Sequence, residues 1–184
     1  GVMNRKLQMY HSGWTDDLHE ILTSYRKDYS SLSLVGFSLG GNMVLKYTCD
    51  GISDLPLNLK SIVAISTPAD LSASSQKLIT LQNKSYDLRF RKTLKEKVRQ
   101  KYKLFPDDIA ISDLKKVRTL WHFDHYFTGP IHGFDGAEDY YAKCNCKQFL
   151  HNAKLPTLMI TAVDDPFLTK ESLVYDIARQ NDKL

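Results

Sequence analysis

Residues 36–40 read Gly-Phe-Ser-Leu-Gly, and the serine between the two glycines is the first candidate for chemistry in this chain. An apolar run precedes Ser38 and a helix-forming segment follows it. In this setting the Gly-x-Ser-x-Gly pattern predicts a nucleophile elbow, whose hydroxyl projects from a strained turn between strand and helix. The glycines keep side chains from colliding at the turn, and the backbone N–H of Leu39 would stabilise an oxyanion. We therefore interpret Ser38 as a nucleophile rather than as a residue of a structural turn.

A nucleophilic serine needs a base, and an acid that orients this base. We expect the acid at the carboxyl end of a later strand, and the segment MITAVDDPFL supplies Asp164 and Asp165 before Pro166. One aspartate would be the acid, and the other would cap the turn or the following helix. We favour Asp165 as the acid, because an aspartate directly before this proline is the commoner pattern. Asp164 is the alternative.

The base in such a set is a histidine, and in one known chain order it follows the acid. The nineteen residues after Asp165 contain no histidine. The histidines of the chain are His11, His19, His122, His125, His132 and His151. Each of them fits a surface or packing position better than the role of a general base, so the sequence leaves Ser38 without an imidazole partner.

Strands and helices alternate around these residues. Apolar runs at 31–37, 60–66 and 156–163 predict three strands, and their nearly continuous apolarity is typical of strands covered on both faces. The segment 39–49 predicts a helix that ends at Gly51. Strand, helix and strand in this order imply parallel pairing through right-handed crossovers.

A further helix is predicted before the first strand, with Thr15 as its N-cap and Asp16 and Asp17 in its first turn, where the helix dipole favours anions. Its expected inward face consists of Leu18, Ile21, Leu22, Tyr25 and Tyr29.

About ninety residues separate the second and third predicted strands, which is more than a crossover helix requires. They are mostly helical in pattern and rich in aromatic residues, so we expect a helical cap, inserted over the sheet at roughly residues 72–135. The whole chain, 1–184, then forms one partial α/β domain. Aromatic side chains that could line a pocket in the cap, although each alone fits plain core better, are Tyr126, Phe127, Phe134, Tyr140 and Tyr141.

The composition, 42% hydrophobic and 25% charged, is that of an ordinary globular protein. No run is long enough to cross a bilayer, and the first ten residues lack the apolar centre of a secretory signal. Three cysteines do not make a disulfide framework and favour a reducing compartment, for which we expect the cytoplasm. Cys144 and Cys146 have no second ligand pair near them, so we expect no metal site.

The net charge of +4 is unevenly placed, because residues 89–103 carry eight basic residues against the single acid Glu96. Such a run can attract phosphates or anionic lipid. The alternative is a solvated helix face, which is favoured by inward apolar residues at four-residue intervals: Phe90, Leu94, Val98 and Tyr102. The run lacks interleaved stacking aromatics and any reading motif, so we expect no nucleic-acid partner.

Four blocks in matching order carry a family resemblance: YHSGWTDDLHEIL, LVGFSLGGNMVLKY, FDHYFTGPIHGFDGAEDYY and LPTLMITAVDDPFL. Together they resemble the YheT-type branch of the α/β-hydrolases, whose relatives include esterases, lipases and alcohol acyltransferases. The resemblance covers nearly the whole chain. It implies that Ser38 is the nucleophile, that Asp165 or Asp164 is the acid, and that residues 121–141 form the segment leading out of the cap.

The departures from that branch lie at the two ends. Its members begin with further strands and a His-Gly loop, and they finish with a strand and a loop that bears the catalytic histidine. We therefore expect this chain to be an internal fragment, inactive alone, with a raw sheet edge and exposed apolar surface.

The function implied by the resemblance is hydrolysis of carboxylic esters with short- to medium-chain acyl groups, or of lipid esters, without a cofactor. The same machinery with an acyl acceptor other than water would make the protein an acyltransferase. A non-catalytic protein of the same fold, which binds a partner or a lipid, is the alternative from another class. The sequence does not separate these three functions.

Overall fold

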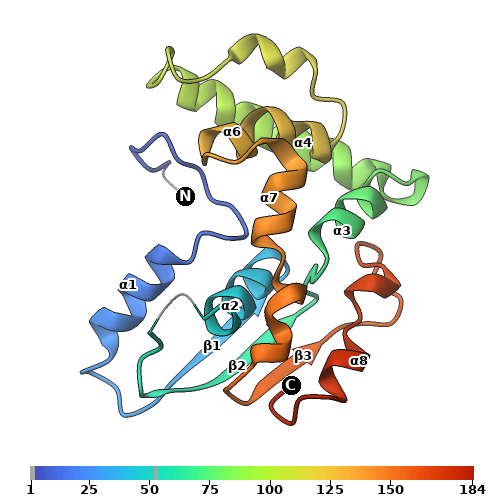
Figure 1. The fold of residues 1–184 in the computed structure, drawn as a ribbon. Coiled ribbons are helices and arrows are strands. Elements are labelled where there is room, and N and C mark those ends of the chain that lie inside the picture. The colour runs from blue at the N-terminus through green and yellow to red at the C-terminus, as the bar shows by residue number, and fades with distance from the viewer. Residues whose placement is uncertain (1–2, 52–53) are drawn as a thin grey trace. The chain divides into compact units, whose positions relative to one another are not determined.

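The computed structural model describes residues 3–51 and 54–184 (Figure 1). The chain divides into two compact units. The helical unit joins Gly1–His11 to Ser75–Lys143, and the sheet unit joins Ser12–Ser74 to Cys144–Leu184. Each unit has its own hydrophobic core. The longer segment of the helical unit, Ser75–Lys143, overlaps the expected insertion at 72–135 and ends eight residues later. A role of this unit as a cap stays a prediction.

Three parallel strands form the centre of the sheet unit, in the order β1 (Leu32–Phe37), β2 (Leu59–Ile65) and β3 (Thr157–Ile160). This confirms the predicted parallel sheet. Phe37 pairs with Ile65, and Ile65 pairs with Ile160, so the carboxyl ends of the three strands lie at one edge of the sheet. β3 is shorter than the predicted strand at 156–163.

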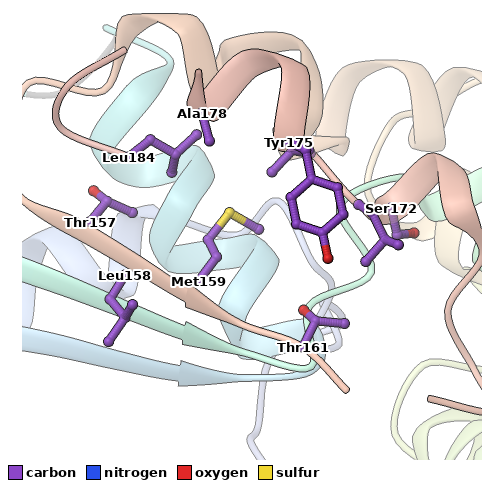
Figure 2. Close-up of a pocket in the computed structure, with 10 residues that line it drawn as sticks. Thr157, Leu158, Met159, Thr161, Ser172, Tyr175, Ala178 and Leu184 are labelled. Atoms are coloured by element: carbon purple, nitrogen blue, oxygen red, sulfur yellow. The ribbon is translucent and has the colours of Figure 1, made fainter. Parts of the chain in front are cut away.

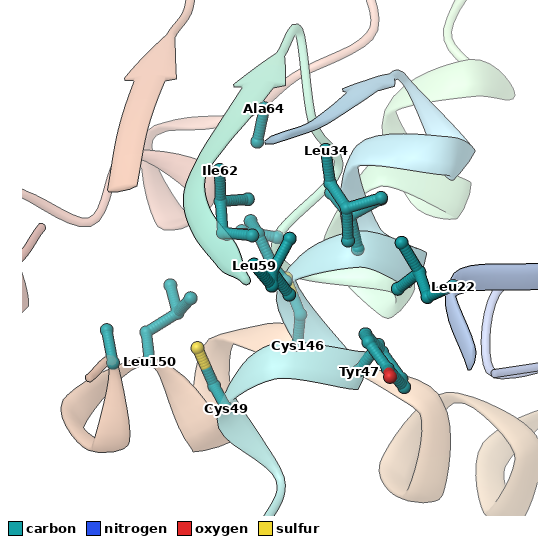
Figure 3. Packing of buried hydrophobic residues seen from close by; sticks show 13 residues of the cluster. Leu22, Leu34, Tyr47, Cys49, Leu59, Ile62, Ala64, Cys146 and Leu150 are labelled. Carbon is teal, nitrogen blue, oxygen red and sulfur yellow. The ribbon is translucent and has the colours of Figure 1, made fainter. Parts of the chain in front are cut away.

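The helices of the sheet unit are α1 (Asp16–Tyr25), α2 (Leu39–Cys49), η4 (Cys146–Asn152), η5 (Lys170–Ser172) and α8 (Tyr175–Ala178). α2 packs on β1 and β2, and η4 packs on α2. Figure 3 shows the core of this unit, to which β1, β2, α2 and η4 all contribute side chains. Its completely buried members include Leu45, Cys146 and Leu150.

The opposite face of the sheet is open, which corrects the expectation that the strands are covered on both faces. Val35 and Phe37 in β1 and Leu158 and Ile160 in β3 are all exposed, Phe37 to 65%. β1 alternates buried and exposed residues, as a strand with one covered face does. The apolar runs predicted buried strands because they do not encode what covers each face. The exposed apolar surface that we expected is present at these positions.

The first helix also differs from its prediction. α1 ends at Tyr25, and of the residues on its expected inward face only Leu22 is buried, whereas Ile21 and Tyr25 are exposed to 54% and 50%. Thr15 stands at the N-cap position, but its side chain makes no capping hydrogen bond. Helical periodicity gave the correct element here and overestimated how much of it is buried.

The helical unit contains η1 (Leu81–Asn83), α4 (Lys84–Tyr102), η2 (Ile111–Lys115), α5 (Leu120–Phe123), η3 (Asp124–Thr128) and α6 (Gly129–Ile131). α3 (Leu71–Leu78) and α7 (Gly136–Cys144) run through the boundaries between the units. Buried in the core of the helical unit are Val98, Ile109, Leu114, Val117, Phe123 and Phe127.

Two sets of side chains in this unit were assigned from the sequence. Of the inward residues expected in α4, Val98 is buried and Leu94 and Tyr102 pack beside the core, but Phe90 is 42% exposed. Of the aromatic residues expected at a pocket, Phe127, Tyr140 and Tyr141 are buried. The Tyr141 hydroxyl makes polar contacts with Ser75 and Asp124 inside the unit.

η3 is a π-helical turn within the helix that runs from α5 to α6, and it places Asp124 in a polar cluster. The Asp124 carboxylate accepts hydrogen bonds from the Thr128 hydroxyl at 2.6 Å and from the Tyr141 phenol at 2.7 Å. The Ser75 hydroxyl lies 3.0 Å from the same phenol oxygen. Burial raises the pKa of Asp124 to about 6, against the lowering effect of its two hydrogen bonds. Burial and the neighbouring carboxylate both raise the pKa of Tyr141.

The raised pKa of Asp124 has a consequence for stability. The folded state holds this proton more tightly than the unfolded state does, whose value lies near 3.8. The contribution of Asp124 to the free energy of unfolding therefore falls as the pH rises from about 4 to about 6, and it stays low above that range.

Asp124→Asn should remove this dependence. We expect the free energy of unfolding of the variant, minus that of the parent, to rise by about 1–3 kcal/mol from pH 4 to pH 7, since each pKa unit corresponds to about 1.4 kcal/mol. Urea unfolding of both proteins at the two pH values measures the difference. Parallel pH profiles for parent and variant would contradict the assignment.

Candidate active site

Ser38 is the single residue between β1 and α2, and its backbone has φ 49° and ψ −120°. Ser38 and Ser66, which follows β2, are the residues other than glycine with positive φ in the described part of the chain. The Ser38 N–H donates to the Ile65 carbonyl at 2.8 Å, and its own carbonyl accepts from the N–H groups of Gly41 and Asn42 at 2.9 and 3.2 Å. Ser38 is exposed. This is the sharp strand-to-helix turn that the sequence predicts.

The glycines around Ser38 make the turn possible, because strand and helix backbones touch there. A Cβ on Gly36 would lie 2.7 Å from the Gly41 Cα and closer still to the Gly40 carbonyl oxygen. A Cβ on Gly41 would run into the Thr67 hydroxyl, just after β2. A clash with backbone atoms cannot be relieved by a small movement, whereas the end of a flexible side chain can move aside. The local sequence therefore fixes how closely α2 follows β1.

Asn42, one helical turn after Ser38, fixes the same end of α2 to two distant segments. It is completely buried, and its amide nitrogen donates to the carbonyls of Cys144 at 2.8 Å and Ser12 at 3.2 Å. Its amide oxygen accepts from the N–H of Cys146 at 3.0 Å. Sequence reasoning missed this residue, although a polar, poor helix former beside an elbow is a signal for such a role.

The first N–H groups of α2 provide the candidate oxyanion donor. Those of Gly41 and Asn42 are used by the Ser38 carbonyl. The N–H of Leu39 donates to no acceptor within the described residues, as is usual for the first residue of a helix. It points from the positive end of the helix dipole, which favours a negative charge there.

Asp164 and Asp165 lie in the loop after β3, at the same edge of the sheet as Ser38 with β2 between. Asp165 is half-buried, and its Oδ1 accepts from the Phe167 N–H at 2.9 Å across Pro166. The turn contact that we expected of the other aspartate is therefore made by the residue that we favour as the acid. Asp164 is exposed. Within the described residues neither carboxylate is hydrogen-bonded to Ser38, so the choice between them stays a prediction.

No imidazole completes the set in the described chain. In the sheet unit, His19 bonds to the Tyr47 hydroxyl at 2.9 Å and His151 is exposed on η4. None of the six histidines is hydrogen-bonded to Ser38, Asp164 or Asp165 among the residues described.

A cavity of about 290 Å³ lies between β3 and α8 (Figure 2). Met159, Thr161 and Leu158 form its strand side, and Tyr175 and Ala178 of α8 line the other. Thr161 directly follows β3, three residues before Asp164. The lining of the cavity contains neither Ser38 nor either aspartate.

The three cysteines are free and buried, and burial raises the pKa of the Cys49 and Cys146 thiols. In the residues that the structure describes, no three side chains of histidine, cysteine, aspartate or glutamate are grouped as metal ligands. None of the helices in the described chain combines the length and apolarity needed to cross a bilayer.

The parallel sheet, the strand-to-helix turn at Ser38 and the order of these residues point to one class of protein. The chain belongs to the alpha/beta hydrolase fold family, whose model matches residues 16–183. Its relatives include YheT of Escherichia coli (strain K12), which is named as an esterase and is 34% identical over 91% of this chain and 50% of YheT. This similarity confirms the resemblance to the YheT-type branch.

Two further relatives are named monoacylglycerol lipase. The protein of Saccharomyces cerevisiae is 27% identical, over 87% of this chain and 37% of its own length. ABHD2 of Homo sapiens is 26% identical, over 91% and 42%. The chain thus spans half or less of the length of these relatives. Among solved structures, a lipase-esterase related protein from Clostridium acetobutylicum aligns with a TM-score of 0.44 and 20% identity, over 100% of this chain and 66% of that one.

The Asn42 contacts lead to a prediction about stability. Asn42→Ala removes three buried hydrogen bonds, to Ser12, Cys144 and Cys146, so we expect a loss of about 3 kcal/mol in the free energy of unfolding. Asn145→Ala is the matched control, because the Asn145 amide oxygen is buried without a hydrogen bond and its removal leaves no partner unpaired. Denaturant unfolding of both variants gives the comparison. Equal losses would show that the Asn42 bonds carry no special weight.

Proposed function

We propose that the protein is a serine hydrolase of carboxylic esters with Ser38 as its nucleophile. The observation that carries this proposal is the backbone of Ser38, a non-glycine residue held at φ 49° between a strand and the N-terminus of a helix. Such a conformation costs of the order of 1–3 kcal/mol and concentrates at functional sites. The relatives named as esterase and as monoacylglycerol lipase support carboxylic esters, lipid esters among them, as the substrate class. Within that class we propose short- to medium-chain acyl groups or lipid esters.

The proposed reaction follows the serine-hydrolase scheme. The Ser38 Oγ attacks the acyl carbon while an imidazole takes its proton, and the Leu39 N–H donates to the oxyanion that forms. The alcohol leaves with that proton. Water then attacks the acyl-serine, releases the acid and restores Ser38. Asp165, or alternatively Asp164, holds the imidazole in the tautomer that the reaction requires.

Asp165 remains compatible with this role despite its turn contact, because Oδ1 accepts from Phe167 and Oδ2 is left for an imidazole. The proposal needs a histidine from sequence that flanks these 184 residues. No cofactor or metal enters the scheme. The buried free thiols support a reducing compartment, for which we propose the cytoplasm.

Two alternatives remain outcomes of experiment. An acyl acceptor other than water would turn the same scheme into acyl transfer. The lack of an imidazole beside Asp164 and Asp165 in the described chain favours a second class, a non-catalytic protein that keeps the elbow for packing.

Ser38→Ala tests the nucleophile. Expressed with its flanking coding sequence, the variant should lose fluorophosphonate labelling and about three or more orders of magnitude in aryl-ester turnover, because the covalent step is removed. Its melting temperature should stay close to that of the parent. Ser66→Ala is the matched control, since Ser66 has the same positive φ, 48°, at the end of the neighbouring strand. Labelling that survives in Ser38→Ala would exclude Ser38, and an unlabelled, inactive parent would favour the non-catalytic alternative.

The choice of acid is tested by Asp165→Asn beside Asp164→Asn. The new amide oxygen can still accept from Phe167, so Asp165→Asn removes the charge while keeping the turn. We expect turnover to fall by about 10⁴-fold in this variant, because a neutral side chain favours the wrong histidine tautomer. Asp164→Asn should be much milder. The reverse order in kcat would transfer the acid role to Asp164.

A further inference from the structure

The N-terminal part of α4 and the turn before it have an unusual surface. Large apolar side chains are exposed there, Leu81 to 87%, Ile79 to 51% and Leu88 to 50%. Exposed cations of α4 and its C-cap are Lys84, Arg89, Lys92, Lys97, Arg99 and Lys103. Single exposed leucines are ordinary, but here Leu88 stands among the cations of α4, and Leu81 lies in η1 directly before them.

Acidic side chains do little to neutralise these cations. Residues 76–106 contain two acids, of which Asp87 is buried and paired with Arg91 at 2.8 Å. Glu96 is exposed and lies 3.4 Å from Arg99. The positive field of this surface is therefore largely uncompensated by its own element.

The helical spacing puts part of this set on one side of α4. We call this set the α4 surface: Leu81, Lys84, Leu88, Lys92, Arg99 and Lys103. From Lys84 onward its members follow one another at intervals of four or seven residues and share one face of α4. Leu81 lies in η1, three residues before Lys84. From Lys84 to Lys103 the face is about 28 Å long, at 1.5 Å per residue. The two leucines occupy one end, and cations continue along the rest.

We propose that the α4 surface docks on an anionic lipid bilayer, with Leu81 and Leu88 entering the boundary between headgroups and acyl chains. Cations alone would suit any polyanion. The exposed leucines gain nothing from a phosphate backbone, whereas a bilayer interface takes up apolar side chains and attracts Lys and Arg together. This contact is interfacial and does not depend on the role of Ser38.

Sedimentation with lipid vesicles tests the proposal. The protein should bind vesicles of phosphatidylcholine mixed with phosphatidylserine and not those of phosphatidylcholine alone, and binding should weaken with added salt. Lys84→Glu/Lys92→Glu should lower the partition coefficient by about 25-fold or more, since each cation near the surface contributes about fivefold. Lys27→Glu/Lys154→Glu, the matched control, makes the same charge change at exposed positions of the sheet unit and should bind like the parent.

Leu81→Ser/Leu88→Ser separates a bilayer from other polyanions. We expect this variant to lose vesicle binding while its melting temperature is unchanged, because both side chains are exposed. Unchanged vesicle binding by this variant would show a general polyanion surface and overturn the proposal. The same conclusion would follow if duplex DNA displaces the protein from vesicles and DNA binding is lost in the charge variant but kept in the leucine variant. Equal losses in the control pair, or no binding by the parent, would overturn it as well.

Discussion

The contact between the backbones of β1 and α2 is the constraint on which the rest of the candidate site depends. Gly36 and Gly41 let the strand end and the first helical turn approach so closely that a Cβ at Gly36 would overlap backbone atoms of Gly40 and Gly41. The chain can then reverse within the single residue Ser38, at the cost of a positive φ. A wider turn would place the hydroxyl away from the helix N-terminus, and with it the Leu39 N–H from any developing oxyanion.

The strain at Ser38 persists because neighbouring segments hold both sides of the turn. The N–H of Ser38 is bound to β2 through Ile65, and Asn42 binds the following turn of α2 to Ser12, Cys144 and Cys146. These contacts join residues that are about thirty and one hundred positions apart in the chain. The five-residue motif is thus held by partners that are distant in the sequence, in β2 and in the segments that contain Ser12 and Cys144.

The sequence predicted the local features well, because each has a local cause. Glycine spacing predicted the sharp strand-to-helix turn at Ser38, and three apolar runs predicted the three parallel strands. Burial was predicted less well, since it depends on what lies opposite. Phe37 and Phe90 are apolar residues that the patterns placed inside, and both are exposed. The Asn42 network and the π-helical turn at Asp124 depend on partners that no local pattern names.

Asp124 shows why a perturbed pKa alone does not locate the active site. A carboxyl group whose pKa is raised to about 6 is the kind of group that general acid–base catalysis uses, and a π-helical turn often marks function. Its two oxygens, however, are occupied by Thr128 and Tyr141. A carboxylate that acts in catalysis, by transferring a proton or by orienting an imidazole, needs a free oxygen within reach of that partner. Asp165 keeps such an oxygen at the sheet edge that carries Ser38, so geometry ranks it above the more strongly shifted carboxylate.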